Sequence, residues 1–159
     1  MAPKVQDLFE KLPLAYAMPD LLPKAPNSAF AQIADEACKE LAPELQAAIW
    51  LYVDDLERSH TISQGIPGPV GAYWHGIMHR REGDFWNAKY WFRQASEVRA
   101  ALAGSLSESG AGSPHSTWDP AAFVDQVELA GGANPEELVD MQRREWMALF
   151  TYCAQRAGE

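Results

Sequence analysis

Apolar and polar positions repeat with a helical period along most of the chain, and they alternate with a period of two nowhere for long. Residues 28–41 follow the helical period. A second, longer helix is predicted from Pro43 to about Ser63, because proline suits a first turn, where its missing N–H would have no partner. The apolar stripe of this helix leads to His60 and consists of Leu45, Ile49, Tyr52, Val53 and Leu56. The pattern therefore predicts an all-α fold.

Glycines and prolines separate the predicted helices in the middle of the chain. The segment GIPGPVG, residues 65–71, predicts a turn, because its two prolines and three glycines cannot continue a helix. A third helix is expected over about residues 70–82 and is ended by Gly83. Asp84 is then expected to cap a fourth helix that runs to about Leu102, since its carboxylate can accept from the free N–H groups of the first turn.

Two further helices follow residues 103–117, a segment rich in serine and glycine that is predicted to be a flexible loop. Asp119 and Pro120 start the first of them, and Asn134 and Pro135 start the second. At the N-terminus, a short amphipathic piece lies among five prolines in the first 27 residues. Residues 1–27 are therefore expected to form a proline-rich arm packed on the body, and residues 28–159 a compact single-domain bundle of five or six helices.

The centre of the chain carries the small and aromatic positions of a helical hairpin. These positions are Gly76, Gly83, Phe85, Ala88, Phe92 and Ala95. Their spacing resembles one tetratricopeptide-type hairpin. The resemblance implies that Ala72, His75, Gly76 and His79 turn toward the following helix. Since a stable array needs about three such repeats and the chain has no second copy, a peptide-binding array is not predicted.

A broader resemblance covers the chain from about Leu51 onward. It is carried by the block YWHGIMHRREGDFWNAKYWFR, together with LERSHTISQ before it and WDPAAFVD and QRREWMALFTYC after it. These segments resemble an uncharacterised family of small bacterial and fungal proteins. The resemblance implies no activity and assigns no catalytic residues.

Three histidines and one glutamate form the candidate metal site. His75 and His79 are one helical turn apart, so both imidazoles can reach one divalent ion, with Glu82 one turn further on and His60 as another imidazole from the preceding helix. Such a set suits zinc, iron, manganese or nickel. His75, His79 and Glu82 are also candidates for acid–base catalysis. The alternative is a structural network, in which neutral imidazoles are satisfied by a backbone carbonyl, Asp54, Asp55 or Glu82.

Positive charge gathers in the same stretch of an otherwise acidic chain. Arg80, Arg81, Lys89 and Arg93 lie within fourteen residues, and guanidinium pairs bind carboxylate or phosphate, so a small anionic ligand is one expectation. Ion pairs with neighbouring acids such as Glu82 and Asp84 are the alternative.

The helical wheel places Trp86 and Tyr90 on the outer side of the fourth predicted helix, together with Arg93. Exposed aromatic and arginine side chains are typical anchors of protein interfaces, so a homo-oligomer or another protein partner is possible on this side. His115, in the predicted loop, is interpreted either as a residue that closes over a site or as a surface residue.

Composition limits the partners. The chain has 13 Lys+Arg against 22 Asp+Glu and a net charge of −9, which repels phosphate backbones and anionic lipids. No nucleic-acid or membrane partner is expected, and the absence of a signal-peptide pattern and of a long apolar run predicts a cytoplasmic protein. Cys38 and Cys153 fit no metal spacing and are interpreted as buried reduced thiols.

No phosphate-binding glycine loop, nucleophile elbow or CxxC motif is present in the sequence. We therefore expect a histidine, glutamate and arginine pocket on the central hairpin that binds a divalent metal or a small anion, with acid–base catalysis as one use of it. The alternative is a non-catalytic interaction or self-assembling module.

Overall fold

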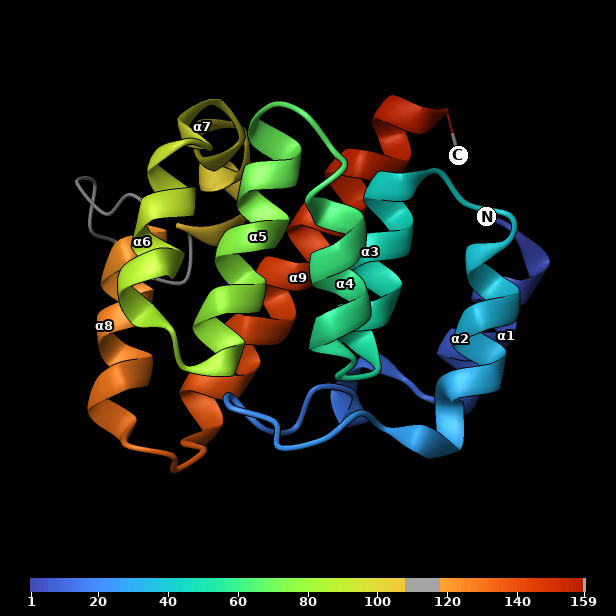
Figure 1. Ribbon diagram of the computed structural model, residues 1–159, viewed down its shortest axis with the longest axis horizontal. Helices are drawn as coiled ribbons and strands as arrows, with labels where there is room; N and C mark the ends of the chain where they lie inside the picture. Colours follow the sequence, from blue (N-terminus) through green and yellow to red (C-terminus); the bar gives the residue numbers. More distant parts are fainter. Residues whose placement is uncertain (108–117, 159) are drawn as a thin grey trace.

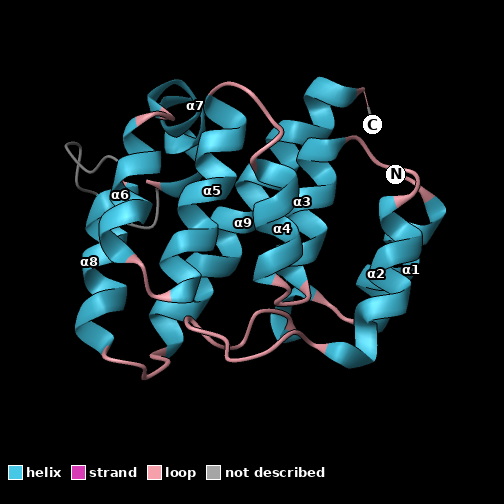
Figure 2. Ribbon diagram, viewed as in Figure 1, coloured by secondary structure: helices cyan, strands magenta, loops and turns pink. Residues whose placement is uncertain are grey.

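The computed structural model describes residues 1–107 and 118–158, and this part of the chain is helical without any strand (Figure 2). The all-α class is confirmed. The helices are α1 (Pro3–Lys11), α2 (Ala31–Cys38), α3 (Pro43–Tyr52), α4 (Leu56–Ser63), α5 (Pro69–Glu82), α6 (Phe85–Arg93), α7 (Ser96–Leu106), α8 (Pro120–Ala130) and α9 (Glu136–Ala157), with 3-10 turns at Leu14–Tyr16 and Ser28–Phe30. None of these helices combines the length and the apolar character that a membrane span requires.

Helix α5 is the centre of the bundle. Figure 1 shows it between α4 and α6, with the long helix α9 crossing behind. Every residue of α5 from Gly71 to Arg81 is buried. A helix that is buried on all sides has no solvent face, so its polar side chains must find partners inside the protein.

Two predicted helices are each broken once, so the described residues contain more helices than the five or six predicted. The helix expected over 43–63 stops at Tyr52, passes through Asp54 at φ +62° and restarts under the cap of Asp55, whose carboxylate accepts from Arg58 N. The helix expected from Asp84 to Leu102 is likewise interrupted at 94–95. The apolar periodicity continues across both breaks, which is why the pattern does not reveal them.

The α5–α6 hairpin has the close approach that its glycines imply. Gly83 ends α5 in the left-handed region at φ +87°. A Cβ atom at Gly76 would lie 2.6 Å from the ring of Phe92, so only glycine lets the two helices pack at this distance. Ala88 and Ala95 are fully buried in the same hairpin region.

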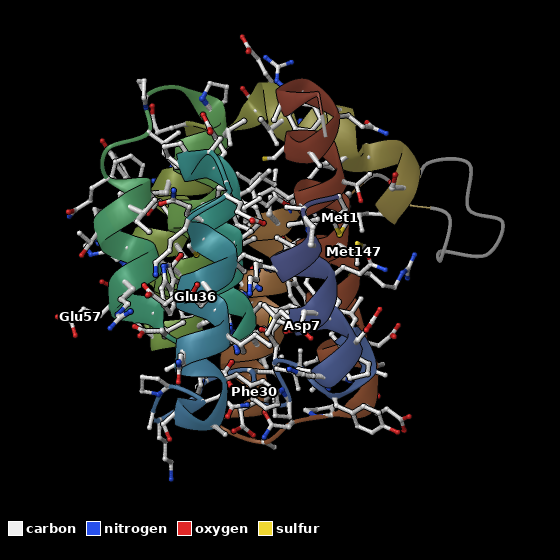
Figure 3. The ribbon with its side chains drawn as sticks, turned by 90° about the vertical axis from the view of Figure 1, so that its right-hand side faces the viewer. Met1, Asp7, Phe30, Glu36, Glu57 and Met147 are labelled. Atoms are coloured by element: carbon white, nitrogen blue, oxygen red, sulfur yellow. The ribbon has the colours of Figure 1, made fainter. Side chains whose placement is uncertain are left out.

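The N-terminal arm is part of the packed body. Figure 3 shows α1 and α2 side by side on one face of the molecule, and Val5 and Leu8 of α1 are completely buried. The chain between them is held by side chains of the body that donate to its carbonyl groups. These bonds are Arg143 to Ala17, Gln142 to Met18 and Asp20, and Arg81 to Asp20.

Asn134 also binds the arm and does not cap α9. Its side-chain oxygen accepts from Leu21 N at 2.8 Å, and its amide nitrogen donates to Asp20 at 3.0 Å. The residue that precedes α9 is Pro135, without a side-chain cap. The expected capping role of Asn134 is therefore wrong, because the neighbouring arm offers it other partners.

A fully buried ion pair joins α5 to α9. Arg80 Nη1 donates to Glu145 Oε1 at 2.8 Å, and Tyr73 Oη donates to Glu145 Oε2 at 2.9 Å. Trp118 Nε1 in turn donates to Tyr73 Oη at 2.8 Å, and the Arg80 guanidinium lies 4.6 Å from the centre of the Phe123 ring. Both carboxylate oxygens are thus used, and the network ties α5, α8 and α9 together.

Removing only the charge of Glu145 should destabilise the protein strongly. Glu145→Gln keeps an acceptor for Tyr73 but leaves the Arg80 guanidinium buried without a counter-charge, at a cost of about 3–5 kcal/mol in the free energy of unfolding. The double variant Arg80→Met, Glu145→Gln should recover most of that loss, because the uncompensated charge is gone. Urea unfolding measures the free energy of unfolding of both variants. If that of Glu145→Gln lay within about 1 kcal/mol of the parent, the importance of this ion pair would be contradicted.

Candidate functional site

The three histidines of the central region come together between α4 and α5. His60 lies on α4 and its ring centre is 4.8 Å from that of His75 and 5.3 Å from that of His79, both on α5. The rings of His75 and His79 are nearly parallel, with their centres 5.3 Å apart. One ring nitrogen from each residue lies within 4.8 Å of the other two. We call His60, His75 and His79 the histidine cluster.

Two members of the histidine cluster are almost completely buried. His75 is 5% exposed and His79 is 7% exposed, whereas His60 is half-buried at the edge. The resemblance to a tetratricopeptide-type hairpin implies that His75 and His79 face the following helix, and the His75 ring does stack on Trp91 of α6, with ring centres 4.1 Å apart. His75 and His79 also face α4, because α5 lies between α4 and α6.

Two of the rings have hydrogen-bond partners on one of their nitrogens. The Glu82 carboxylate accepts from His79 Nδ1 at 2.8 Å, so in the neutral ring Nε2 is the nitrogen with the lone pair. The Gln64 side-chain amide lies 3.3 Å from His60 Nε2. With its oxygen turned toward the ring, Gln64 accepts from Nε2 and leaves Nδ1 as the lone-pair nitrogen. Gln64 lies four positions after His60, and Glu82 lies three positions after His79.

Burial favours the neutral form of His75 and of His60. Desolvation, and then repulsion by His60 and His79 in their charged forms, lowers the pKa of His75 from 6.5 to about 4. Desolvation and the proximity of His79 also lower the pKa of His60, and the Glu82 carboxylate partly opposes this shift. The lowered pKa values of His75 and His60 therefore favour their uncharged forms at neutral pH, in which each ring has a lone pair for a ligand.

The arginines expected beside the histidines lie elsewhere. Arg80 is paired with Glu145, and Arg81 donates to Asp54 Oδ1 at 2.6 Å and to the Leu51 carbonyl, with both guanidinium groups fully buried. Successive helical positions are about 100° apart, so two residues directly after His79 point away from its side of α5. The structure does not bring Arg80 or Arg81 to the histidine cluster.

The remaining predicted residues are on the surface of α6. Trp86 is 74% exposed and Tyr90 is 40% exposed, and their rings stack with centres 6.3 Å apart. Arg93 is exposed in the last turn, and Lys89 pairs with Asp125 of α8. His115 lies outside the described residues.

A second group of possible ligands shares His79. Glu82 and Asp84 each offer a carboxylate oxygen within 4.8 Å of it and of each other. Both acids are exposed, and the Asp84 carboxylate already caps α6 by accepting from Asn87 N. The histidine cluster is therefore the better enclosed of the two groups.

Sequence reasoning did not predict the parts played by Gln64 and Trp91. Gln64 is four residues after His60, the spacing at which side chains meet on a helix, so this neighbour was visible in the sequence. Trp91 fits the apolar stripe of its helix, and nothing in the sequence distinguishes stacking on His75 from ordinary packing. A cavity of about 370 Å³ lies beside these rings and is lined by His75, Tyr90 and Trp91 among others.

Acid should destabilise the metal-free protein through His75. The unfolded chain takes up this proton at the ordinary pKa of 6.5 and the folded protein only at about 4, so the unfolded state binds more protons between these values. The free energy of unfolding should fall as the pH is lowered through this window and be unaffected by this group above it. Urea unfolding of the parent and of His75→Gln, both in the presence of a chelator, isolates the contribution of His75 to the free energy of unfolding. If this free energy changed with pH in the same way in both proteins, the prediction would be contradicted.

No family model matches this chain, and neither does any curated protein or solved structure. The fold and the histidine cluster are thus the observations from which a function can be argued. The site consists of three clustered imidazoles, one carboxylate hydrogen-bonded to Nδ1 of His79, and a neighbouring cavity.

Proposed function

We propose that the histidine cluster binds one divalent transition-metal ion, with zinc as the ion that best matches its ligands. The observation that carries this proposal is the convergence of three imidazole nitrogens within 4.8 Å of one another. Imidazole is a preferred ligand of zinc, and zinc sites with three protein ligands leave a fourth position open. The proposed site is therefore of the open kind that enzymes use.

The surroundings of His79 support the proposal. A histidine that binds a metal usually donates its other ring N–H to a carboxylate, which orients the ring and strengthens the ligand. The 2.8 Å contact from His79 Nδ1 to Glu82 has this form. Glu82, predicted as a fourth ligand, is thus proposed to hold His79 in place.

The protonation states of His75 and His60 also support the proposed metal site. Only a neutral imidazole has a lone pair to give to a metal, and the lowered pKa of His75 and of His60 keeps both in that form at neutral pH. Nitrogens bound to one tetrahedral zinc are about 3.3 Å apart, as follows from bond lengths of about 2.0 Å. Binding of the ion would therefore require the three rings to draw closer together, and His60 is the least buried of them.

A metal ion in this position would supply Lewis acidity and lower the pKa of a bound water. Glu82 and the histidines would orient the ion, and the adjoining cavity would admit a reactant. A cytoplasmic location belongs to this proposal, since Cys38 and Cys153 are buried free thiols, as in proteins of reducing compartments.

Metal titration of protein without a histidine tag tests the proposal. Calorimetry with Zn²⁺, Co²⁺, Ni²⁺ and Mn²⁺ should give one site per chain, with Zn²⁺ tighter than Co²⁺ and Mn²⁺ weakest. His60→Ala, His75→Ala and His79→Ala should each weaken zinc on the order of 100-fold or more, and Glu82→Gln about 10- to 100-fold through the orientation of His79.

A carboxylate on another helix provides the matched control. Glu128→Gln changes an exposed carboxylate of α8 that belongs to neither group of possible ligands, and it should leave the affinity unchanged. Circular dichroism checks that the variants are folded. Binding that is absent, or that survives His75→Ala and His79→Ala unchanged, would leave the cluster as a structural network of neutral imidazoles.

The exposed aromatic pair on α6 favours a second candidate function, self-assembly or binding of a partner protein. Trp86 and Tyr90 are stacked in the open, and large exposed aromatic side chains commonly anchor interfaces. A second copy of this chain is the simplest partner to test, and the face includes Arg93 near its end.

Light scattering over a range of protein concentrations tests self-assembly. If the chain dimerises through this face, Trp86→Ala should weaken the dimer by at least about tenfold, as expected of an interface anchor. Tyr16→Ala is the matched control, because Tyr16 is 73% exposed and lies far along the chain from α6. A monomer at every concentration, or equal effects of the two substitutions, would rule this face out as a dimer interface.

A further inference from the structure

The cavity next to the histidine cluster is suited to a particular kind of molecule. It has a volume of about 370 Å³, within the range of small-molecule sites, and it lies between the end of α4, the loop before α5, the first turns of α5, and α6. His75 is the member of the histidine cluster that lines it. A molecule in this cavity would therefore meet the proposed metal from the side of His75.

The walls of the cavity are aromatic. Tyr90 and Trp91 line it from α6, and their rings meet edge to face at an angle of 86° with centres 5.3 Å apart. Trp91 is itself stacked on His75 at an angle of 7°. These flat surfaces favour a flat ring in the ligand, because aromatic pairs gain energy beyond their buried area.

The opposite wall is a short, tightly packed loop. Ile66, Pro67 and Pro69 line the cavity there. A Cβ atom at Gly71 would lie 2.0 Å from the carbonyl oxygen of Ile66, so the loop is pressed directly on α5 and only glycine fits. The cavity is thus formed before a ligand arrives, which reduces the entropic cost of binding.

Charge is missing from the lining. Among the described residues, no Asp, Glu, Lys or Arg side chain lines the cavity, and the polar side chains in the lining include the amides of Gln64 and Gln94. An ionised ligand would lose its hydration without gaining a counter-ion from these walls, which disfavours it. Neutral hydrogen-bonding groups can be satisfied by the two amides.

We propose that this cavity takes an uncharged, planar, ring-bearing small molecule that places one nitrogen or oxygen donor at the open position of the metal. This inference rests on the proposed metal site and adds the class of ligand to it. It replaces the small anion expected from the sequence. Arg80 and Arg81 are buried in ion pairs, and Lys89 and Arg93 are not among the described residues that line the cavity.

Spectroscopy of the cobalt-substituted protein tests the proposal. The full chain is loaded with Co²⁺ in a calorimetric titration, and the visible absorption of the bound ion is then followed while benzimidazole, imidazole or benzoate is added. Benzimidazole should change the spectrum at a concentration at least about tenfold lower than that needed for imidazole, because its second ring adds aromatic contacts. It should also act at a concentration at least about tenfold lower than that needed for benzoate, because benzoate carries a charge and benzimidazole does not.

Three variants assign the effect to the cavity. Tyr90→Ala removes one aromatic wall and should abolish the advantage of benzimidazole over imidazole, whereas Trp86→Ala, on the same helix but outside the cavity, should preserve it. Gln94→Lys places a cation in the lining and should raise the affinity for benzoate by about tenfold without changing cobalt binding. Gln94 and Tyr90 are both exposed, so these variants should fold.

The outcomes separate the two proposals. If Co²⁺ binds but benzoate has the same affinity as benzimidazole, the proposed ligand class is wrong and the metal site stands. The same conclusion follows if Tyr90→Ala leaves the advantage of benzimidazole over imidazole unchanged. If Co²⁺ does not bind in the first titration, the metal site is wrong and this inference fails with it.

Discussion

The placement of helix α5 depends on two adjacent buried arginines. Arg80 and Arg81 are fully buried, and each is neutralised by a carboxylate from a distant part of the chain, Glu145 of α9 and Asp54 at the break between α3 and α4. A buried guanidinium without its carboxylate costs several kcal/mol, so α5 cannot rotate or slide without losing both pairs. Because the arginines occupy one side of α5, His75 and His79 are fixed on the other, toward α4 and α6.

The same arginine contacts explain why the N-terminal arm is part of the body. Arg81 donates to Asp20 of the arm as well as to Asp54, and Gln142 donates to the same carbonyl group of Asp20 from α9. The arm therefore supplies acceptors for buried donors of Arg81 and Gln142, in addition to covering the core with Val5 and Leu8. Its residues contribute to the environment that holds α5 in place.

The histidine cluster is the consequence of this arrangement. Burial lowers the pKa of His75 and of His60, which favours their neutral forms, and His79 is oriented by Glu82. Imidazoles in such an enclosed group are costly as mere filling, since apolar side chains would pack there without any need for polar partners. The proposed metal would provide such a partner, and the cavity beside His75 would provide access to it.

The sequence alone determined the helical class, the presence of a turn before α5, the end of α5 at Gly83 and the spacing that puts His75 and His79 on one side of a helix, because these are local properties of periodicity and of glycine and proline. The turn is shorter than the predicted 65–71, since α5 already begins at Pro69. Only the tertiary structure decided where α3 and α6 stop, that Asn134 binds the arm, and that Arg80 and Arg81 lie in the core while Trp91 stacks on His75. The reason is physical: these outcomes depend on partners far away in the chain, such as Glu145 and Asp54, and periodicity contains no information about which distant carboxylate meets a buried charge.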